Sequence, residues 1–161
     1  MSDGQAANEE LISRFYDAFA RLDHETMAAS YAPGATFEDP AFGRLEGDEI
    51  GAMWRMLCEA ATDLEISYRD VTCDSDAGSA HWDADYTFSR TGRKVHNEID
   101  ARFTFENGLI KTHRDSFSMW RWMRQAVGPI GLVLGWTPIL PALFRRTARA
   151  QLEKFTHQSV N

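Results

Sequence analysis

The strongest constraint on the fold is a stretch of alternating apolar and polar residues, "SAHWDADYTFS", at residues 79–89. Successive side chains of a strand point to opposite faces, so this pattern predicts a half-buried antiparallel strand. The turn signals "RTGR" and "ENGL" follow, and the Asn107-Gly108 pair in the second favours a tight hairpin. With "LEISYRDVTCD" before them, these segments predict a meander of four strands at about 64–74, 79–90, 94–106 and 109–118.

Helices are predicted before this sheet. Apolar residues recur at helical spacing from Leu11 to Leu22, and "DHETMAASYA" continues the pattern with Met27 and Tyr31. "PGATFEDP" interrupts it around a short strand, and a third helix is expected after Gly47. Helices followed by a curved antiparallel sheet define an α+β architecture.

The C-terminal part differs in character from the rest. Residues 1–119 contain 11 Lys and Arg against 23 Asp and Glu, whereas residues 120–161 contain 6 against 1. An acidic body disfavours nucleic acid as a partner. The apolar, basic tail predicts broken helical pieces and then a helix near 139–156. It either closes a pocket, packs on a partner subunit, or lies on a membrane surface as an interfacial helix, which is the less favoured interpretation.

The chain of 161 residues is long enough for one ordinary domain. Neither a signal peptide nor a membrane-spanning segment is indicated, so a cytoplasmic location is expected. Cys58 and Cys73 lack the spacing of a zinc site and are expected to be reduced and structural. Because no metal-ligand cluster or phosphate-binding glycine loop is visible, the expected chemistry needs no metal and no cofactor.

The residues that could carry chemistry lie at two places. In "LIKTHRDSFSMW" two strand phases are open. The phase that includes Phe117 puts His113 and Asp115 on one face, about 7 Å apart at the usual strand rise. A His and an Asp two residues apart on a strand more often belong to a solvated face, so that alternative stays open. Asp39, before Pro40, is either a turn residue or a carboxylate at the mouth of a pocket.

The order of these segments resembles the nuclear-transport-factor-2-like superfamily. The resemblance covers about residues 8–120 and rests on "LISRFYDAFARLDHETMAASYAPGATFEDPAFGRLEG", on "MWRML" and on the hairpin "ARFTFENGLIKTHRDSF". It implies a cone-shaped domain at residues 1–120, in which a curved sheet wraps around helices and a deep apolar pocket. A C-terminal helical extension, residues 121–161, would pack on the same domain. The resemblance also implies a homodimer formed through the outer face of the sheet.

Some functional residues can be transferred from the resemblance. Asp39 in "EDP" matches the catalytic base of ketosteroid isomerases, which combine an Asp base with an oxyanion hole made by a Tyr and a protonated Asp. The position of the oxyanion tyrosine holds Phe15, with Tyr16 beside it, and that of the oxyanion aspartate falls on Ala101, so this hole is incomplete. His113 and Asp115 resemble the polar pair on the last strand of SnoaL-like cyclases.

The charged network of epoxide hydrolases in the same superfamily is not matched. That network needs charged side chains inside the cone, whereas Asp100 and Arg102 have the strand phase opposite to Phe103. They are therefore expected on the outer face.

The expected function is isomerisation, cyclisation or hydration of a small hydrophobic carbonyl compound, with Asp39, His113 and Asp115 as catalytic residues. The alternative is a non-catalytic module of the same fold that binds a small ligand or dimerises. The side chains expected to line the pocket are mostly aromatic, and core packing is their other interpretation: Phe15, Tyr16, Tyr31, Trp54, Trp82, Tyr86, Ala101, Phe103 and Phe117.

Overall fold

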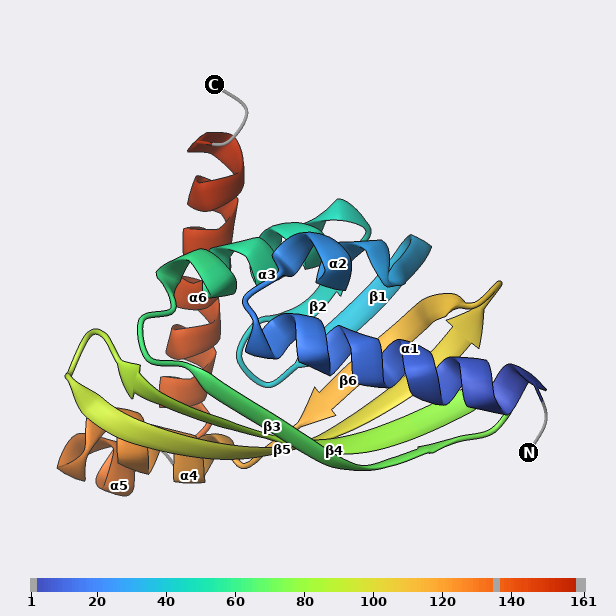
Figure 1. Cartoon of the computed structure of the whole chain (residues 1–161). Helices are drawn as coiled ribbons and strands as arrows, with labels where there is room; N and C mark the ends of the chain where they lie inside the picture. Colours follow the sequence, from blue (N-terminus) through green and yellow to red (C-terminus); the bar gives the residue numbers. More distant parts are fainter. Residues whose placement is uncertain (1–2, 135–136, 159–161) are drawn as a thin grey trace.

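A curved six-stranded sheet, covered on its concave side by helices, forms the body of the protein in the computed structural model (Figure 1). The structure describes residues 3–134 and 137–158. The strand order is β2-β1-β6-β5-β4-β3. The elements follow one another as α1 (Asp3–Ala20), α2 (His24–Ala29), β1 (Tyr31–Asp39), β2 (Gly43–Glu46), α3 (Asp48–Ala60), β3 (Glu65–Cys73), β4 (Ala77–Phe88), β5 (Arg93–Glu106), β6 (Leu109–Ser116), α4 (Met119–Val127), α5 (Pro129–Leu134) and α6 (Ile139–Gln158).

The predicted meander is confirmed as strands β3 to β6, which pair antiparallel in sequence order. Asn107 and Gly108 both have positive φ, at 52° and 75°. The tight turn between β5 and β6 requires this conformation. Along β5, buried and exposed residues alternate from Val95 to Phe103. This alternation confirms that Asp100 and Arg102 lie on the outer face.

Strand β1 joins the sheet by a parallel pairing with β6. Tyr31, predicted to continue the second helix, is instead the first residue of β1, because α2 ends at Ala29 and Tyr31 pairs with Ile110 of β6. The predicted short strand is therefore longer, and it contains an irregularity at Gly34, where φ is 68°. Strand β2 was not predicted, since four residues carry too little periodicity.

The core lies between the concave face of the sheet and helices α1, α2 and α3. Its largest fully buried side chains include Phe15 and Tyr16 of α1, Phe37 of β1 and Phe103 of β5. A second, smaller cluster joins Val95 to helix α4 through Trp122, Met123 and Ala126. Cys58 and Cys73 are both free, as predicted.

The C-terminal segment forms the broken helical pieces predicted for it, α4 and α5, and then helix α6. Residues 135–136 and 159–161 of the predicted extension lie outside the described residues. Within the part of the chain that is described, no helix combines the length and the apolar character needed to cross a membrane.

Candidate active site

A chain of hydrogen bonds runs through the interior from α3 to β4. The Trp54 indole N–H donates to the Tyr31 hydroxyl at 3.1 Å, and this hydroxyl lies 2.7 Å from His113 Nδ1. His113 Nε2 lies 2.9 Å from Asp115 Oδ1, and the Trp82 indole N–H donates to the same oxygen at 3.4 Å. The structure thus brings His113 and Asp115 together on the inner face, which settles the strand phase that the sequence left open.

The hydrogen-bond partners assign the protons of this chain. An ionised Asp115 only accepts, so His113 Nε2 carries the proton and Nδ1 accepts from the Tyr31 hydroxyl. The hydroxyl in turn accepts from Trp54. Every member has a partner while the imidazole is neutral, which is the condition for a stable polar network in a core.

Aromatic rings enclose His113 almost completely. Phe15, Phe37 and Phe103 have ring centroids 5.6, 5.0 and 4.4 Å from the imidazole. Tyr31 and Trp54 stack on it at 6.1 and 6.2 Å. The His113 side chain has no exposed surface and that of Asp115 is 3% exposed. A low-polarity surrounding of this kind strengthens the electrostatic effect of every charge inside it.

Asp39 lies at the end of β1, next to this cluster. Asp39 is two residues after Phe37, so both side chains point to the inner face of the sheet. Phe37 lies opposite His113 in the parallel pairing of β1 and β6. Asp39 Oδ1 accepts the Phe42 N–H at 2.6 Å. This is the turn role that the sequence offered as one alternative. No hydrogen bond joins Asp39 to His113 or Asp115 in the described residues.

Asp39 as a whole is half-buried, but its carboxyl group is largely withdrawn from water. This desolvation raises the pKa of Asp39 from 3.8 to about 7, and the charge of Asp115 also raises it. The N–H groups of Phe42 and Ala41 and the charge of Arg145 act in the opposite direction. A carboxyl group with a pKa near neutrality is suited to accept and return protons. Asp39 is therefore both a turn residue and a titratable group at the edge of the cluster.

Tyr16 contributes the one buried hydroxyl near Asp115 that lacks a hydrogen-bond partner among residues 3–134 and 137–158. Its side chain is fully buried. Burial raises the pKa of Tyr16 well above its usual value, and the charge of Asp115 adds to the effect. A buried hydroxyl without a partner is costly to stability, and it is available to donate to a bound molecule.

The other residues predicted to line the pocket lie either beside the hydrogen-bonded chain or in the second cluster, around Val95 and α4. Ala101 pairs with Asp115 in the register of β5 and β6, so it lies beside the hydrogen-bonded chain. Tyr86 does not join it, because its hydroxyl accepts the Trp122 indole N–H at 2.6 Å in the second cluster. Phe117 is half-buried and packs against both clusters.

Two arginines of α6 hold the turn that carries Asp39, a role the sequence did not reveal. Arg145 donates to the Pro40 carbonyl, and Arg149 donates to the carbonyls of Phe42 and Arg44 at 3.0 and 2.8 Å. Gly43 has a φ of 72°, and a Cβ there would lie 3.3 Å from Arg145 Cδ. A side chain at this position would therefore be both strained and crowded.

Removing the charge of Arg145 is expected to raise the pKa of Asp39 above 7. The guanidinium favours the ionised carboxylate, and Arg145→Gln abolishes that contribution. The pKa can be measured from the carboxyl carbon of Asp39 by NMR titration. Arg146→Gln is the matched control, because it removes the neighbouring charge from an exposed side chain of α6 and is expected to leave the pKa unchanged. Equal pKa values in both variants would contradict the role assigned to Arg145.

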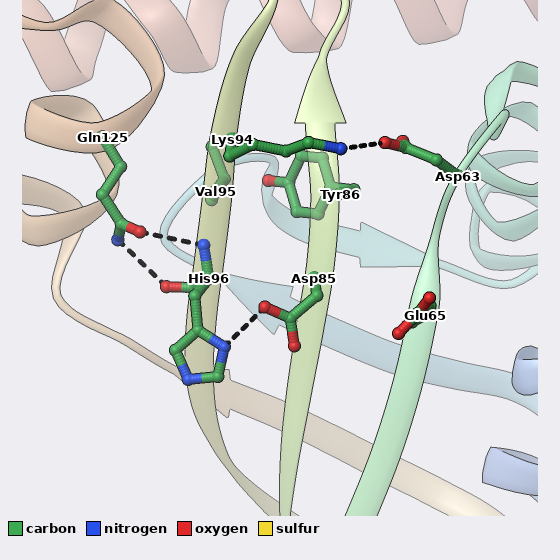
Figure 2. A pocket seen from close by; sticks show the side chains of 8 residues that line it. All are labelled: Asp63, Glu65, Asp85, Tyr86, Lys94, Val95, His96 and Gln125. Carbon is green, nitrogen blue, oxygen red and sulfur yellow. Dashed lines mark hydrogen bonds and ion pairs between the residues drawn. The ribbon is translucent and has the colours of Figure 1, made fainter.

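Two surface pockets lie outside the hydrogen-bonded chain from Trp54 to Trp82. The first, of about 300 Å³, is lined by Asp63, Glu65, Asp85, Tyr86, Lys94, Val95, His96 and Gln125 (Figure 2). The second, of about 500 Å³, lies around Cys73, Gly78 and Phe103. In the described part of the chain neither pocket includes Asp39, His113 or Asp115. His113 and Asp115 are buried, so a substrate can reach these two residues only if the surrounding side chains move.

The curved sheet with helices on its concave face is the architecture of the nuclear-transport-factor-2-like class. Within this class the chain belongs to the SnoaL-like domain family, whose sequence pattern it matches over residues 12–113. The comparison with curated proteins gave no match to this chain.

Solved structures share this fold at low sequence identity. A protein from Jannaschia sp. CCS1 that is described as a SnoaL-like polyketide cyclase has a TM-score of 0.70 at 18% identity, covering 80% of this chain and 97% of that one. An LEH-like epoxide hydrolase of M. tuberculosis has a TM-score of 0.65 at 17% identity, covering 81% and 98%. A protein of ketosteroid isomerase-like fold from Catenulispora acidiphila DSM 44928, in complex with trimethylamine, has a TM-score of 0.66 at 14% identity, covering 80% and 98%. At these identities the likeness concerns the fold.

Proposed function

We propose that the protein catalyses proton transfer at a carbon next to a carbonyl group in a small hydrophobic molecule, without a cofactor. The observation that carries this proposal is the carboxyl group of Asp39, with a pKa of about 7, next to a buried network that ends on Asp115. The aromatic surroundings favour an apolar substrate. Relatives of the same fold that are described as cyclases and epoxide hydrolases are consistent with acid/base chemistry of this general kind.

In the proposed reaction the ionised Asp39 accepts the proton from the substrate carbon. The electron pair of the broken C–H bond forms a C=C bond to the carbonyl carbon, and the π pair of the C=O bond moves onto the oxygen, which gives an enolate. The Tyr16 hydroxyl donates a hydrogen bond to this oxygen, since it has no other partner in the described residues. Returning the proton to another carbon gives isomerisation, whereas attack of the enolate carbon on a second carbonyl gives cyclisation.

His113 and Tyr31 act on this reaction through their positions. His113 holds Asp115 by a hydrogen bond, and the Tyr31 hydroxyl holds His113 in turn. The fixed negative charge of Asp115 raises the pKa of Asp39, which makes Asp39 a stronger base than an exposed carboxylate. Hydration is the third reaction of this type, with Asp39 activating a water molecule.

Exchange of hydrogen for deuterium next to a carbonyl tests this proposal directly. A panel of hydrophobic cyclic ketones is incubated with the protein in D₂O, and loss of the proton signal is followed by NMR. For any ketone on which the wild type is active, Asp39→Asn should slow exchange about 10²- to 10⁴-fold, the usual contribution of a general base. Tyr16→Phe is expected to slow it by about 10- to 1000-fold.

The matched control is Asp76→Asn, which changes an exposed carboxylate on the turn between β3 and β4 and should leave the rate unchanged. If Asp39→Asn and Asp115→Asn both exchanged at the wild-type rate, the assignment of these residues would be wrong. A wild type that bound the ketones but accelerated exchange on none of them would favour the non-catalytic ligand-binding alternative.

A further inference from the structure

The outer face of the sheet carries the same short pattern on two neighbouring strands. It reads "HWDAD" at residues 81–85 of β4 and "HNEID" at residues 96–100 of β5. The antiparallel register places Asp83 directly opposite Glu98 at the centre of the two patterns. Carboxylates directly opposite each other on a sheet repel, so the centre of this face favours a cation.

Both histidines of these patterns are oriented by a carboxylate. His81 Nδ1 lies 2.8 Å from Asp100 Oδ1, and His96 Nδ1 lies 2.8 Å from Asp85 Oδ1, the second of which is visible in Figure 2. An ionised carboxylate can only accept, so each Nδ1 donates and each neutral imidazole keeps the lone pair on Nε2. Histidines that bind metals are held in this way by the N–H of their other ring nitrogen.

The two Nε2 atoms face the same oxygen. Asp83 Oδ1 lies 3.5 Å from His81 Nε2 and 3.8 Å from His96 Nε2. His81 Nε2 is buried and makes no hydrogen bond within the described ranges, 3–134 and 137–158. Lone pairs that point at a carboxylate oxygen are unfavourable unless a proton or a metal ion lies between them. Metal–ligand bonds of about 2.0–2.2 Å in a tetrahedral site separate neighbouring ligand atoms by about 3.3–3.6 Å, close to the distance at His81.

We propose that His81, Asp83 and Glu98 bind a divalent transition-metal ion, with zinc as the ion that best fits this donor set. One ligand atom from each of the three residues lies within 4.8 Å of the other two. The Asp83 side chain is only 10% exposed, so one ligand is fixed by the surrounding structure. Imidazole and carboxylate together are typical zinc ligands.

The two nearby guanidinium groups leave room for the ion. Arg69 bonds Asp83 through Oδ2, and Arg121 bonds Glu98 through Oε2, so the other oxygen of each carboxylate remains for the metal. The four carboxylates of the two patterns outnumber these two arginines by two negative charges. A divalent ion balances this difference.

The metal site is independent of the proposed reaction. The side chains of His81, Asp83 and Glu98 lie on the opposite face of the sheet from those of His113 and Asp115. The site borders the pocket of Figure 2, whose lining includes Asp85 and His96. The bound ion would join β4 to β5 across their central pair. A ligand that binds only the folded chain stabilises it, so the metal is expected to raise the thermal midpoint.

Zinc titration of the chelator-treated protein by isothermal calorimetry tests the site. The wild type is expected to bind one zinc ion per chain, and His81→Gln and Asp83→Asn should each weaken binding at least 10-fold. His157→Gln removes an exposed histidine near the end of α6 and should leave the affinity unchanged. Absence of zinc binding by the wild type, or an equal loss in His157→Gln and His81→Gln, would overturn the proposal.

A second measurement covers variants that fail to fold. Circular dichroism shows whether each variant is folded, and Glu98→Gln replaces Asp83→Asn if the latter is not. Cobalt(II) substituted for zinc should give the intense visible absorption of a tetrahedral site, and this signal should be lost in His81→Gln. A stoichiometry of one zinc per two chains would contradict a site made within one chain, whatever the mass of the protein in sedimentation.

Discussion

Replacing His113 by alanine is expected to lower the free energy of unfolding by about 3–5 kcal/mol. The substitution opens a cavity among five aromatic rings, and it leaves the Tyr31 hydroxyl and the Asp115 carboxylate without their shared partner. Buried polar groups that lose a partner bear the full cost of desolvation. Unfolding in urea, followed by circular dichroism at neutral pH, measures the change.

Two further variants separate the loss of hydrogen bonds from the loss of packing in His113→Ala. Tyr31→Phe keeps the ring but removes the acceptor of Trp54 and the donor to His113. It should therefore cost about 1–3 kcal/mol. His157 is exposed. Its replacement by alanine should change the free energy of unfolding by less than about 0.5 kcal/mol. A loss below about 1 kcal/mol in His113→Ala would show that the hydrogen-bonded chain is not formed as described.

Asp39→Asn is expected to make the protein more stable than the wild type at pH 8 and about equally stable at pH 4. In the folded chain the pKa of Asp39 rises from 3.8 to about 7 because its carboxyl group is desolvated. A raised pKa means that ionisation is easier in the unfolded chain, so the wild type loses stability as the pH rises through this window. The difference should reach on the order of 3 kcal/mol above pH 7.

Urea unfolding at pH 4, 6 and 8 tests this dependence. Asn can still accept the Phe42 N–H through its side-chain oxygen, so the turn is kept. Asp76→Asn on the exposed turn should follow the wild type at each pH. The interpretation of Asp39 as a desolvated titratable group fails if the stabilities of Asp39→Asn and wild type differ by the same amount at pH 4 and pH 8.

Local pattern was sufficient to predict most of the sheet. The alternating pattern around Trp82 and the turn at Asn107-Gly108 can be recognised from neighbouring residues alone. Strands β3 to β6 lie close to the positions that these patterns predict. The prediction for Tyr31 was wrong because a tyrosine at helical spacing is also a good strand residue, and only the end of α2 at Ala29 and the pairing with β6 decide between the two structures.

The candidate site was only partly predictable. His113 and Asp115 are two residues apart on one strand, so their side chains lie on the same face. The sequence left open only whether that face is the inner or the outer one. Arg145 and Arg149 contact a turn that lies more than 100 residues earlier in the chain, and no periodic pattern encodes such a contact. His81 and Glu98 likewise come from different strands, and their proximity depends on the register of β4 and β5.

The parallel pairing of β1 with β6 also determines when the site can form during synthesis. Tyr31 and His113 are separated by 82 positions, and β1 pairs only with β2 and β6 among the described strands. At about 5–20 residues per second, the ribosome adds the intervening chain in roughly 4–16 s. Throughout that time the edge of β1 that pairs with β6 stays open, although Trp54 of α3 can already pack on Phe15, Phe19 and Phe37. An open strand edge promotes pairing with other chains, so the newly made N-terminal third carries this risk until β6 is made.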